Sequence, residues 1–171
     1  MSQIHVSPIS KVEATIATTS SRHLVTLLSE GTAFERPAAI SAQNHPFLRM
    51  HDIVEAADGM MLPGRRQVAS ILDFARRWDA STPLVVNCYA GISRSTATAY
   101  MIVAALRPDR DEAEIAATLR RASPSATPNL RLISIADELL GRSGRMTKAI
   151  VSIGRGADAF EGTPFALPLD R

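Results

Sequence analysis

Residues 84–95 have the sequence LVVNCYAGISRS, and this stretch decides the fold. Its first three residues, 84–86, form a compact apolar segment of the kind that is buried in a central sheet. Residues 96–106, which follow the stretch, are apolar nearly all round, as in a helix that lies in the core. The stretch therefore places a polar loop with one cysteine and one arginine between a buried strand and a buried helix.

The loop has the composition of an anion-binding site. Its successive backbone N–H groups can converge on one point at the start of a helix, where the helix dipole also favours negative charge. Gly91 allows a backbone conformation that would strain other residues. Arg94 can hold two oxygens of a phosphate group with two parallel N–H donors. We therefore expect the phosphate to be bound by Tyr89, Ala90, Gly91, Ile92, Ser93 and Arg94.

Cys88 is the candidate nucleophile of this loop. An environment that binds anions also stabilises the thiolate, which is the reactive form of cysteine. Ser95 can donate a hydrogen bond to the sulfur and help it leave in a second step. The alternative is an inert core cysteine, because cysteine is among the most buried residue types. The combination with glycine at +3, arginine at +6 and serine at +7 favours the catalytic interpretation.

Cys88 is also the only cysteine among the 171 residues. An internal disulfide and a cysteine-based zinc site are therefore both excluded. The four histidines show no metal-ligand spacing. We expect the protein to need no metal and no other cofactor.

The charge and hydropathy patterns indicate where the protein works. The net charge is +2, and the arginines are dispersed rather than gathered on the basic face that nucleic-acid binding needs. The N-terminal residues lack the basic and apolar regions of a signal peptide. No apolar stretch approaches the roughly 18 residues that span a bilayer. We expect a cytoplasmic protein that binds no nucleic acid and has no membrane span.

Short apolar segments alternate with amphipathic segments along the chain. The expected strands are 4–9, 23–28, 47–50 and 84–86, and the expected helices are 11–19, 67–78, 96–106 and 109–122. A further helix is expected to have Thr127 as its cap residue and Pro128 at its first position, and to run through Leu140. This order predicts a single α/β domain with a largely parallel central sheet flanked by helices, over residues 1–141.

The C-terminal residues 142–171 are less regular. Within them, residues 146–153 are expected to form a last helix or strand. Residues 154–171 contain several glycines and prolines, and we expect them to wrap the surface or to be mobile. We treat 142–171 as an extension that is packed on the same domain or trails from it.

Two segments resemble the cysteine-dependent protein tyrosine phosphatases, whose signature is His-Cys, five residues, Arg and Ser or Thr. Residues 90–95, AGISRS, look like the dual-specificity branch of that superfamily. Residues 123–129, SPSATPN, are similar to a segment with Pro-Asn that lies about 35 residues beyond the loop of those enzymes. The resemblance spans roughly residues 20–140. It implies a protein tyrosine phosphatase-like fold.

The resemblance also implies an activity. These enzymes hydrolyse phosphate monoesters without a metal, through a phosphocysteine intermediate. Their substrate is a phosphorylated protein or another phosphate monoester. For this chain the resemblance implies protein phosphotyrosine first, and phosphoserine or phosphothreonine as well if the enzyme has dual specificity. Cys88 would be the nucleophile, Arg94 the phosphate clamp and Ser95 the group that assists the leaving sulfur.

The family uses an aspartate as general acid, on a loop about 30–40 residues before the cysteine. Asp52 directly follows an apolar strand, where the family places this residue. Asp58, in the dipeptide Asp58-Gly59, resembles the acid loop of another branch. Each aspartate also has an ordinary explanation, since Asp52 can cap a turn and Asp58-Gly59 is a common turn dipeptide. We favour Asp52 as the general acid.

One residue departs from the signature, because Asn87 stands where the family has a histidine. Asparagine can donate hydrogen bonds but carries no charge, so we expect it to stabilise the thiolate less than histidine does. Two other functions stay open. One is a rhodanese-like or arsenate-reducing enzyme, which also uses a cysteine in an anion site. The other is a non-catalytic domain that binds phosphorylated partners.

Overall fold

The computed structural model describes residues 2–170, in which five strands form one sheet in the order β3-β2-β4-β1-β5. Four strands run parallel, and the last runs antiparallel to β1. The strands are β1 (Gln3–Pro8), β2 (His23–Leu28), β3 (Phe47–Arg49), β4 (Leu84–Cys88) and β5 (Phe165–Pro168). This mostly parallel sheet confirms the predicted α/β class. Met1 and Arg171, the outer ends of the predicted segments 1–141 and 142–171, lie outside the described residues.

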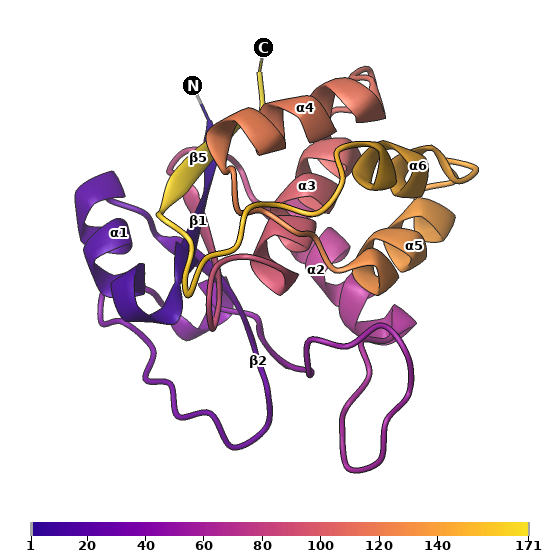
Figure 1. The fold of residues 1–171 in the computed structure, drawn as a ribbon. Coiled ribbons are helices and arrows are strands. Elements are labelled where there is room, and N and C mark those ends of the chain that lie inside the picture. The colour runs from indigo at the N-terminus through magenta and orange to yellow at the C-terminus, as the bar shows by residue number, and fades with distance from the viewer. Residues whose placement is uncertain (1, 171) are drawn as a thin grey trace.

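The helices cover both faces of the sheet unequally. One helix packs on one face and the other five form the layer on the opposite face (Figure 1). In chain order they are α1 (Val12–Thr19), α2 (Arg65–Arg77), α3 (Arg94–Leu106), α4 (Glu112–Ala122), α5 (Leu130–Leu139) and α6 (Arg145–Ser152). The lone helix is α1. Within residues 2–170, no helix is long and apolar enough to cross a membrane.

The central strands are apolar at successive positions because both of their faces are covered. In β4, Val85 packs with Val12 and Ile16 of α1, whereas Val86 belongs to the larger core on the other face. Side chains of a strand alternate between the two faces, so both neighbours must be apolar here. The helix α3 is buried along its length from Arg94 to Ala104. Its apolar surface predicted this central position correctly.

The helix α5 begins later than the sequence pattern predicts. Thr127 and Pro128 precede it, and Asn129 is the cap residue, with its side chain accepting hydrogen bonds from the N–H groups of Arg131 and Leu132. The hydroxyl of Thr127 instead donates to the Ser125 carbonyl. The predicted cap at Thr127 is therefore wrong, because this side chain is used by the preceding turn while Asn129 caps α5.

The C-terminal residues contain one helix and one strand. Within the expected segment 146–153, the structure has a helix, α6, which packs against α4 and α5. The strand β5 was not predicted, and it pairs with β1 at the edge of the sheet. Its four residues show no long apolar pattern, and its partner strand lies at the other end of the chain.

The parallel strands bring four chain segments to one edge of the sheet. Their carboxyl ends meet there, as is usual for ligand sites in α/β proteins. Cys88 ends β4, Ser29 follows β2, Met50 follows β3 and Pro8 ends β1. The functional candidates of the sequence therefore lie at this edge.

Candidate active site

The segment from Cys88 to Arg94, here called the Cys88 loop, joins β4 to α3. Four of its carbonyl groups are paired with other segments of the chain. The carbonyls of Tyr89, Ala90, Ile92 and Ser93 accept hydrogen bonds from N–H groups of other segments, at 3.0, 2.7, 2.9 and 3.3 Å. Among the described residues, no acceptor is present for the backbone N–H groups of residues 90–93. A loop with paired carbonyls and free N–H groups is an anion-binding geometry.

Gly91 is required at its position in this loop. Its φ angle is +69°, in the region where residues with a side chain are strained. A Cβ atom on Gly91 would also lie 2.7 Å from the backbone nitrogen of Pro8. Both the conformation and the close approach of β1 therefore exclude a side chain.

Cys88 lies at the base of the loop and is only 2% exposed. Its Sγ atom is 3.0 Å from Oγ of Ser95, which lies in the first turn of α3. When the sulfur is a thiolate, it can only accept this bond, so the serine hydroxyl donates. The structure thus brings together the two residues that the sequence pairs as nucleophile and assistant.

Arg94 is buried and anchored along one edge of its guanidinium group. Nη1 donates to the Met50 carbonyl at 2.7 Å and to the hydroxyl of Ser29 at 3.1 Å. Within the described part of the chain, the buried Nε atom has no hydrogen-bond partner. A buried N–H without a partner costs free energy unless a ligand satisfies it. The anchored edge fixes the group, and the Nε side remains available to a bound oxyanion.

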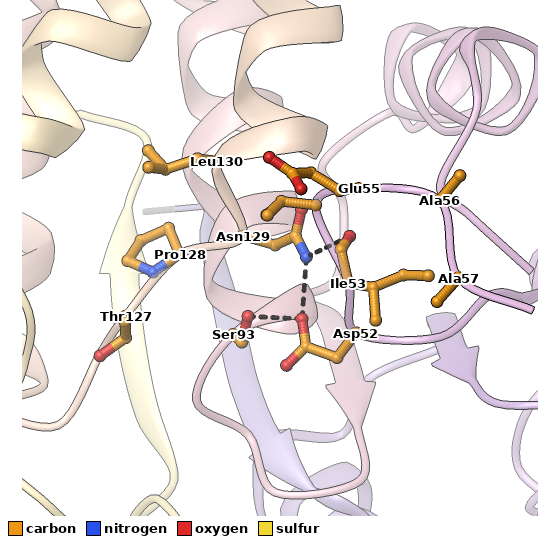
Figure 2. A pocket seen from close by; sticks show the side chains of 11 residues that line it. Asp52, Ile53, Glu55, Ala56, Ala57, Ser93, Thr127, Pro128, Asn129 and Leu130 are labelled. Atoms are coloured by element: carbon orange, nitrogen blue, oxygen red, sulfur yellow. Dashed lines mark hydrogen bonds between the residues drawn. The ribbon is translucent and has the colours of Figure 1, made fainter. Parts of the chain in front are cut away.

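Asp52 lies beside the Cys88 loop. Its Oδ1 atom accepts a hydrogen bond from the Ser93 hydroxyl at 2.7 Å and another from Nδ2 of Asn129 at 2.9 Å. Figure 2 shows these two donors meeting at one carboxylate oxygen while the other oxygen points away from them. Asn129 also donates to the carbonyl of Ile53, so it holds both the aspartate and its loop.

Asp58 is placed differently. It lies in the exposed turn that Gly59 forms with a φ angle of +71°. No hydrogen bond or ion pair of its side chain is present within residues 2–170. Only Asp52 of the two candidate acids contacts the Cys88 loop.

A groove of about 620 Å³ opens beside Asp52. Figure 2 shows the residues around it, which come from the loop after β3, from Ser93 and from the start of α5. Apart from Asp52, Glu55 and a few polar groups, its walls are apolar. They include Ile53, Val54 and Leu130. The groove therefore places apolar surface next to the Asp52 carboxylate.

Asn87 replaces the histidine of the family signature, and its side chain is fully buried. Its Oδ1 accepts a 2.7 Å hydrogen bond from the Thr26 hydroxyl, which is also 2.8 Å from Nε2 of His45. Because the threonine hydroxyl has one proton, this arrangement makes Nε2 of His45 the donor. Burial, with a smaller contribution from the charge of Arg36, lowers the pKa of His45 to about 4. Asn87 is thus held by a chain of neutral groups that leads away from the Cys88 loop.

Some residues of the site could not be selected from the sequence. Ser29 and Met50 reach Arg94 only because β2 and β3 end at the same edge of the sheet. Asn129 was part of the Pro-Asn segment, but its contact with Asp52 joins residues 77 positions apart. For this residue the Pro-Asn segment was a usable signal, whereas for Ser29 no local signal exists.

Comparison with known proteins gives matches in structure alone. No family model and no curated protein matches the chain. The fold is similar to the crystal structure of DUSP15, with a TM-score of 0.64 and 13% identity over 92% of this chain and 99% of that one. It is also similar to human DUSP28, with a TM-score of 0.60 and 14% identity over 82% and 92% of the two chains. The PTP-2 phosphatase of Cydia pomonella matches at 0.60, with 13% identity over 79% and 84%.

Proposed function

Because the chain has the fold of the dual-specificity and tyrosine phosphatases, as the sequence predicted, we propose that it hydrolyses phosphate monoesters through a phosphocysteine intermediate. Cys88 is the nucleophile and Arg94 holds the phosphate. Asp52 is the general acid and then the general base. Ser95 assists the departure of the sulfur. No step of this mechanism uses a metal ion.

In the first step, the Cys88 thiolate attacks phosphorus and an S–P bond forms. The bond between phosphorus and the ester oxygen breaks, and the carboxylic acid of Asp52 gives its proton to the departing alcohol or phenol. The free N–H groups of residues 90–93 and the Nε side of Arg94 face the charge that develops on the phosphoryl oxygens.

In the second step, the Asp52 carboxylate takes a proton from a water molecule. The water oxygen attacks phosphorus, the S–P bond breaks and inorganic phosphate is released. The sulfur leaves as a thiolate that accepts a hydrogen bond from the Ser95 hydroxyl, 3.0 Å away. Asp52 ends the cycle protonated and ready for the next substrate.

The observation that carries this proposal is the pairing pattern of the Cys88 loop. Its carbonyls are bonded outward, its N–H groups are free among the described residues and the buried Nε of Arg94 has no partner there. These groups belong to the loop that begins at the single cysteine. A bound tetrahedral oxyanion would accept hydrogen bonds from these donors, and an inert core cysteine gives no reason for this arrangement of donors.

Protein phosphotyrosine is the substrate class that the groove beside Asp52 favours. Its apolar walls, which include Ile53 and Val54, suit an aromatic leaving group better than a small polar one. Sulfur transfer and arsenate reduction gain no comparable support, because neither needs an aspartate held against the loop. Asp52 is held there by Ser93 and Asn129.

The experiment is hydrolysis of para-nitrophenyl phosphate with a chelator present. We expect Cys88→Ser to lower kcat by at least about a thousandfold, because the covalent route is lost. Asp52→Asn is expected to lower it by roughly a hundredfold, because the base that activates water in the second step is lost, and Asp58→Asn by less than about twofold. The chelator leaves the wild-type rate unchanged.

The same assay can reject the proposal. A rate that needs added metal, or that survives Cys88→Ser, would exclude the phosphocysteine mechanism. Absence of turnover in the wild type, together with tight binding of a phosphotyrosyl peptide, would support the non-catalytic alternative. A loss confined to Asp58→Asn would move the acid role to that residue.

A further inference from the structure

Two exposed aromatic side chains belong to segments that contact each other although these segments are far apart in sequence. The chain has five phenylalanines, two tyrosines and one tryptophan. Of these, Phe160 is 97% exposed and Tyr89 is 58% exposed, whereas the others are buried or half-buried. Tyr89 belongs to the Cys88 loop. Phe160 belongs to residues 154–164, here called the C-terminal arm, which join α6 to β5.

The C-terminal arm is fixed to the Cys88 loop. The N–H of Gly162 donates to the carbonyl of Ala90 at 2.7 Å, and a Cβ atom on Gly162 would lie 2.8 Å from the Gly91 carbonyl oxygen. The arm therefore touches the loop at a distance that only glycine allows. Figure 1 shows this yellow segment passing the loop that leads into α3. Phe160 precedes Gly162 by two residues, and Tyr89 directly precedes Ala90, the residue that accepts the hydrogen bond from Gly162.

The arm is also held on its other side. The N–H of Gly156 donates to Oγ1 of Thr127, and the N–H of Ala157 donates to the carbonyl of Pro124. Between these bonds and Gly162, the arm lines a hollow of about 260 Å³ whose opposite wall includes Asp52 and Ser93. Phe160 is thus an exposed ring on a segment pinned at both sides, beside the proposed catalytic loop.

The charges beside Phe160 argue for a polypeptide rather than an anionic membrane as its partner. Arg155 pairs with Asp158 at 2.6 Å, and Lys11 pairs with Glu161 at 3.2 Å. Both of these cations are therefore matched by a carboxylate of the arm. Membrane-surface binding relies on unmatched basic residues around the apolar side chains.

We infer that Phe160 and Tyr89 form a recognition surface for apolar side chains that flank the phosphorylated residue of a polypeptide substrate. The inference rests on the proposed function, since it places the phosphate in the Cys88 loop. Aromatic side chains are enriched where proteins bind proteins, because they offer a large, rigid apolar area. A small aryl phosphate fills the loop alone, whereas the neighbouring residues of a peptide extend over the arm.

The test measures binding rather than turnover. Cys88→Ser protein is titrated, by fluorescence anisotropy, with two peptides of the same length that carry a central phosphotyrosine. One has leucine on both sides of it, and the other has glycine. We expect the leucine peptide to bind about five to ten times more tightly, as burial of one or two apolar side chains against Phe160 predicts.

Two variants locate this preference. Phe160→Ala, made in the Cys88→Ser protein, is expected to reduce it to less than about twofold. The ring is almost fully exposed, so its removal leaves no cavity and the fold is kept. Met60→Ala is the matched control, because Met60 is an exposed apolar residue outside the arm. This control is expected to keep the full preference.

Several results would overturn the inference. Equal affinities for the two peptides, or a preference for the leucine peptide that survives Phe160→Ala, would show that Phe160 does not bind the residues that flank the phosphotyrosine. Phe160-dependent binding to phosphatidylserine vesicles, with equal peptide affinities, would assign the surface to lipid instead. Failure of the proposed function appears elsewhere, as hydrolysis that survives Cys88→Ser, so the two failures are distinguishable.

Discussion

Arg94 has two tasks that use different edges of one guanidinium group. Nη1 is committed to Met50 and Ser29, which leaves the Nε side for the substrate. A lysine has a single ammonium group and cannot fill both tasks. We expect Arg94→Lys to lower kcat/KM for para-nitrophenyl phosphate by at least about a hundredfold. A loss below fivefold would mean that Arg94 holds the loop and not the phosphate.

Asn129 both caps the helix α5 and donates a hydrogen bond to the proposed general acid, Asp52, and mutation can separate these two roles. Its Oδ1 caps α5, and its Nδ2 donates to Asp52. Serine also caps helices, but its short side chain cannot replace the amide donor. We therefore expect Asn129→Ala and Asn129→Ser both to lower kcat by about tenfold. Only the alanine variant should lose about 1 kcal/mol of stability in urea unfolding.

The pH profile of the Asn129→Ser variant provides a further check. If Asn129 positions the acid, the shape of the kcat profile against pH should differ between the variant and the wild type. If kcat instead falls by the same factor at every pH, and the variant is also less stable in urea, Asn129 acts only as the cap of α5.

At the same residue scale, the sequence predicted the groups that are close together in the chain. Cys88, Arg94 and Ser95 lie within the short segment 88–95, so their types and spacing were enough to name them as candidates. The position of Asp52 directly after an apolar strand favoured it over Asp58 in the sequence. The contacts of Asp52 with Ser93 and Asn129 could not be predicted, because these residues come from distant segments.

Among the elements, the segment that leads into β3 contains a group, the His45 side chain, whose protonation destabilises the fold. The pKa of His45 is lowered to about 4, chiefly by burial, against 6.5 for an ordinary histidine. The unfolded chain therefore binds more protons than the folded chain between these values. The stabilisation is complete above pH 6.5 and is lost as the pH falls towards 4.

This predicts a melting temperature that rises from pH 4 to pH 6.5, with a shallower rise in His45→Gln. Glutamine can keep a hydrogen bond to Thr26 but does not titrate in this range. Burial also lowers the pKa values of His5 and His23, so part of the rise remains in the variant. Identical slopes in calorimetric scans of the two proteins would exclude the contribution of His45.

The start of α6 depends on one carboxylate. Asp137 accepts hydrogen bonds from the N–H groups of Gly144, Met146 and Thr147, at 2.6, 2.7 and 3.3 Å. A negative charge at a helix N-terminus is favourable. We expect Asp137→Asn to cost about 1–3 kcal/mol in urea unfolding. The exposed neighbour Glu138, changed to Gln, should cost less than about 0.5 kcal/mol; equal costs would contradict the capping role.

Elements with strong local patterns were the ones that the sequence predicted. The strand β4 and the helix α3 are largely apolar and lie close to where they were expected. The helix α5 began late because two polar residues competed for its cap, and tertiary contacts of Thr127 decided between them. The strand β5 has only four residues, and it forms because β1 offers a free edge.

At the scale of the whole molecule, we propose that residues 142–171 fold together with residues 1–141. Leu167 of β5 and Met146 of α6 are fully buried in the main core. We expect urea unfolding to be a single transition by fluorescence and by circular dichroism. Two separate transitions would indicate an extension that folds on its own.

A substitution in β5 tests the same point energetically. Leu167→Ala removes a buried side chain from the main core, and we expect it to cost about 2–5 kcal/mol of the stability of the whole chain. Phe160→Ala, in the exposed part of the arm, is expected to cost almost nothing. A change below 0.5 kcal/mol for Leu167→Ala would mean that β5 contributes little to the core.

The central claim is a covalent phosphocysteine on Cys88, and its direct test is mass spectrometry of an acid-quenched reaction with para-nitrophenyl phosphate. In Asp52→Asn, attack on this reactive ester still proceeds, but the base that activates water is missing, so the intermediate should accumulate. We predict one added phosphoryl group on the peptide that contains Cys88, and none in Cys88→Ser. Hydrolysis without this adduct, or an adduct on another residue, would contradict the account.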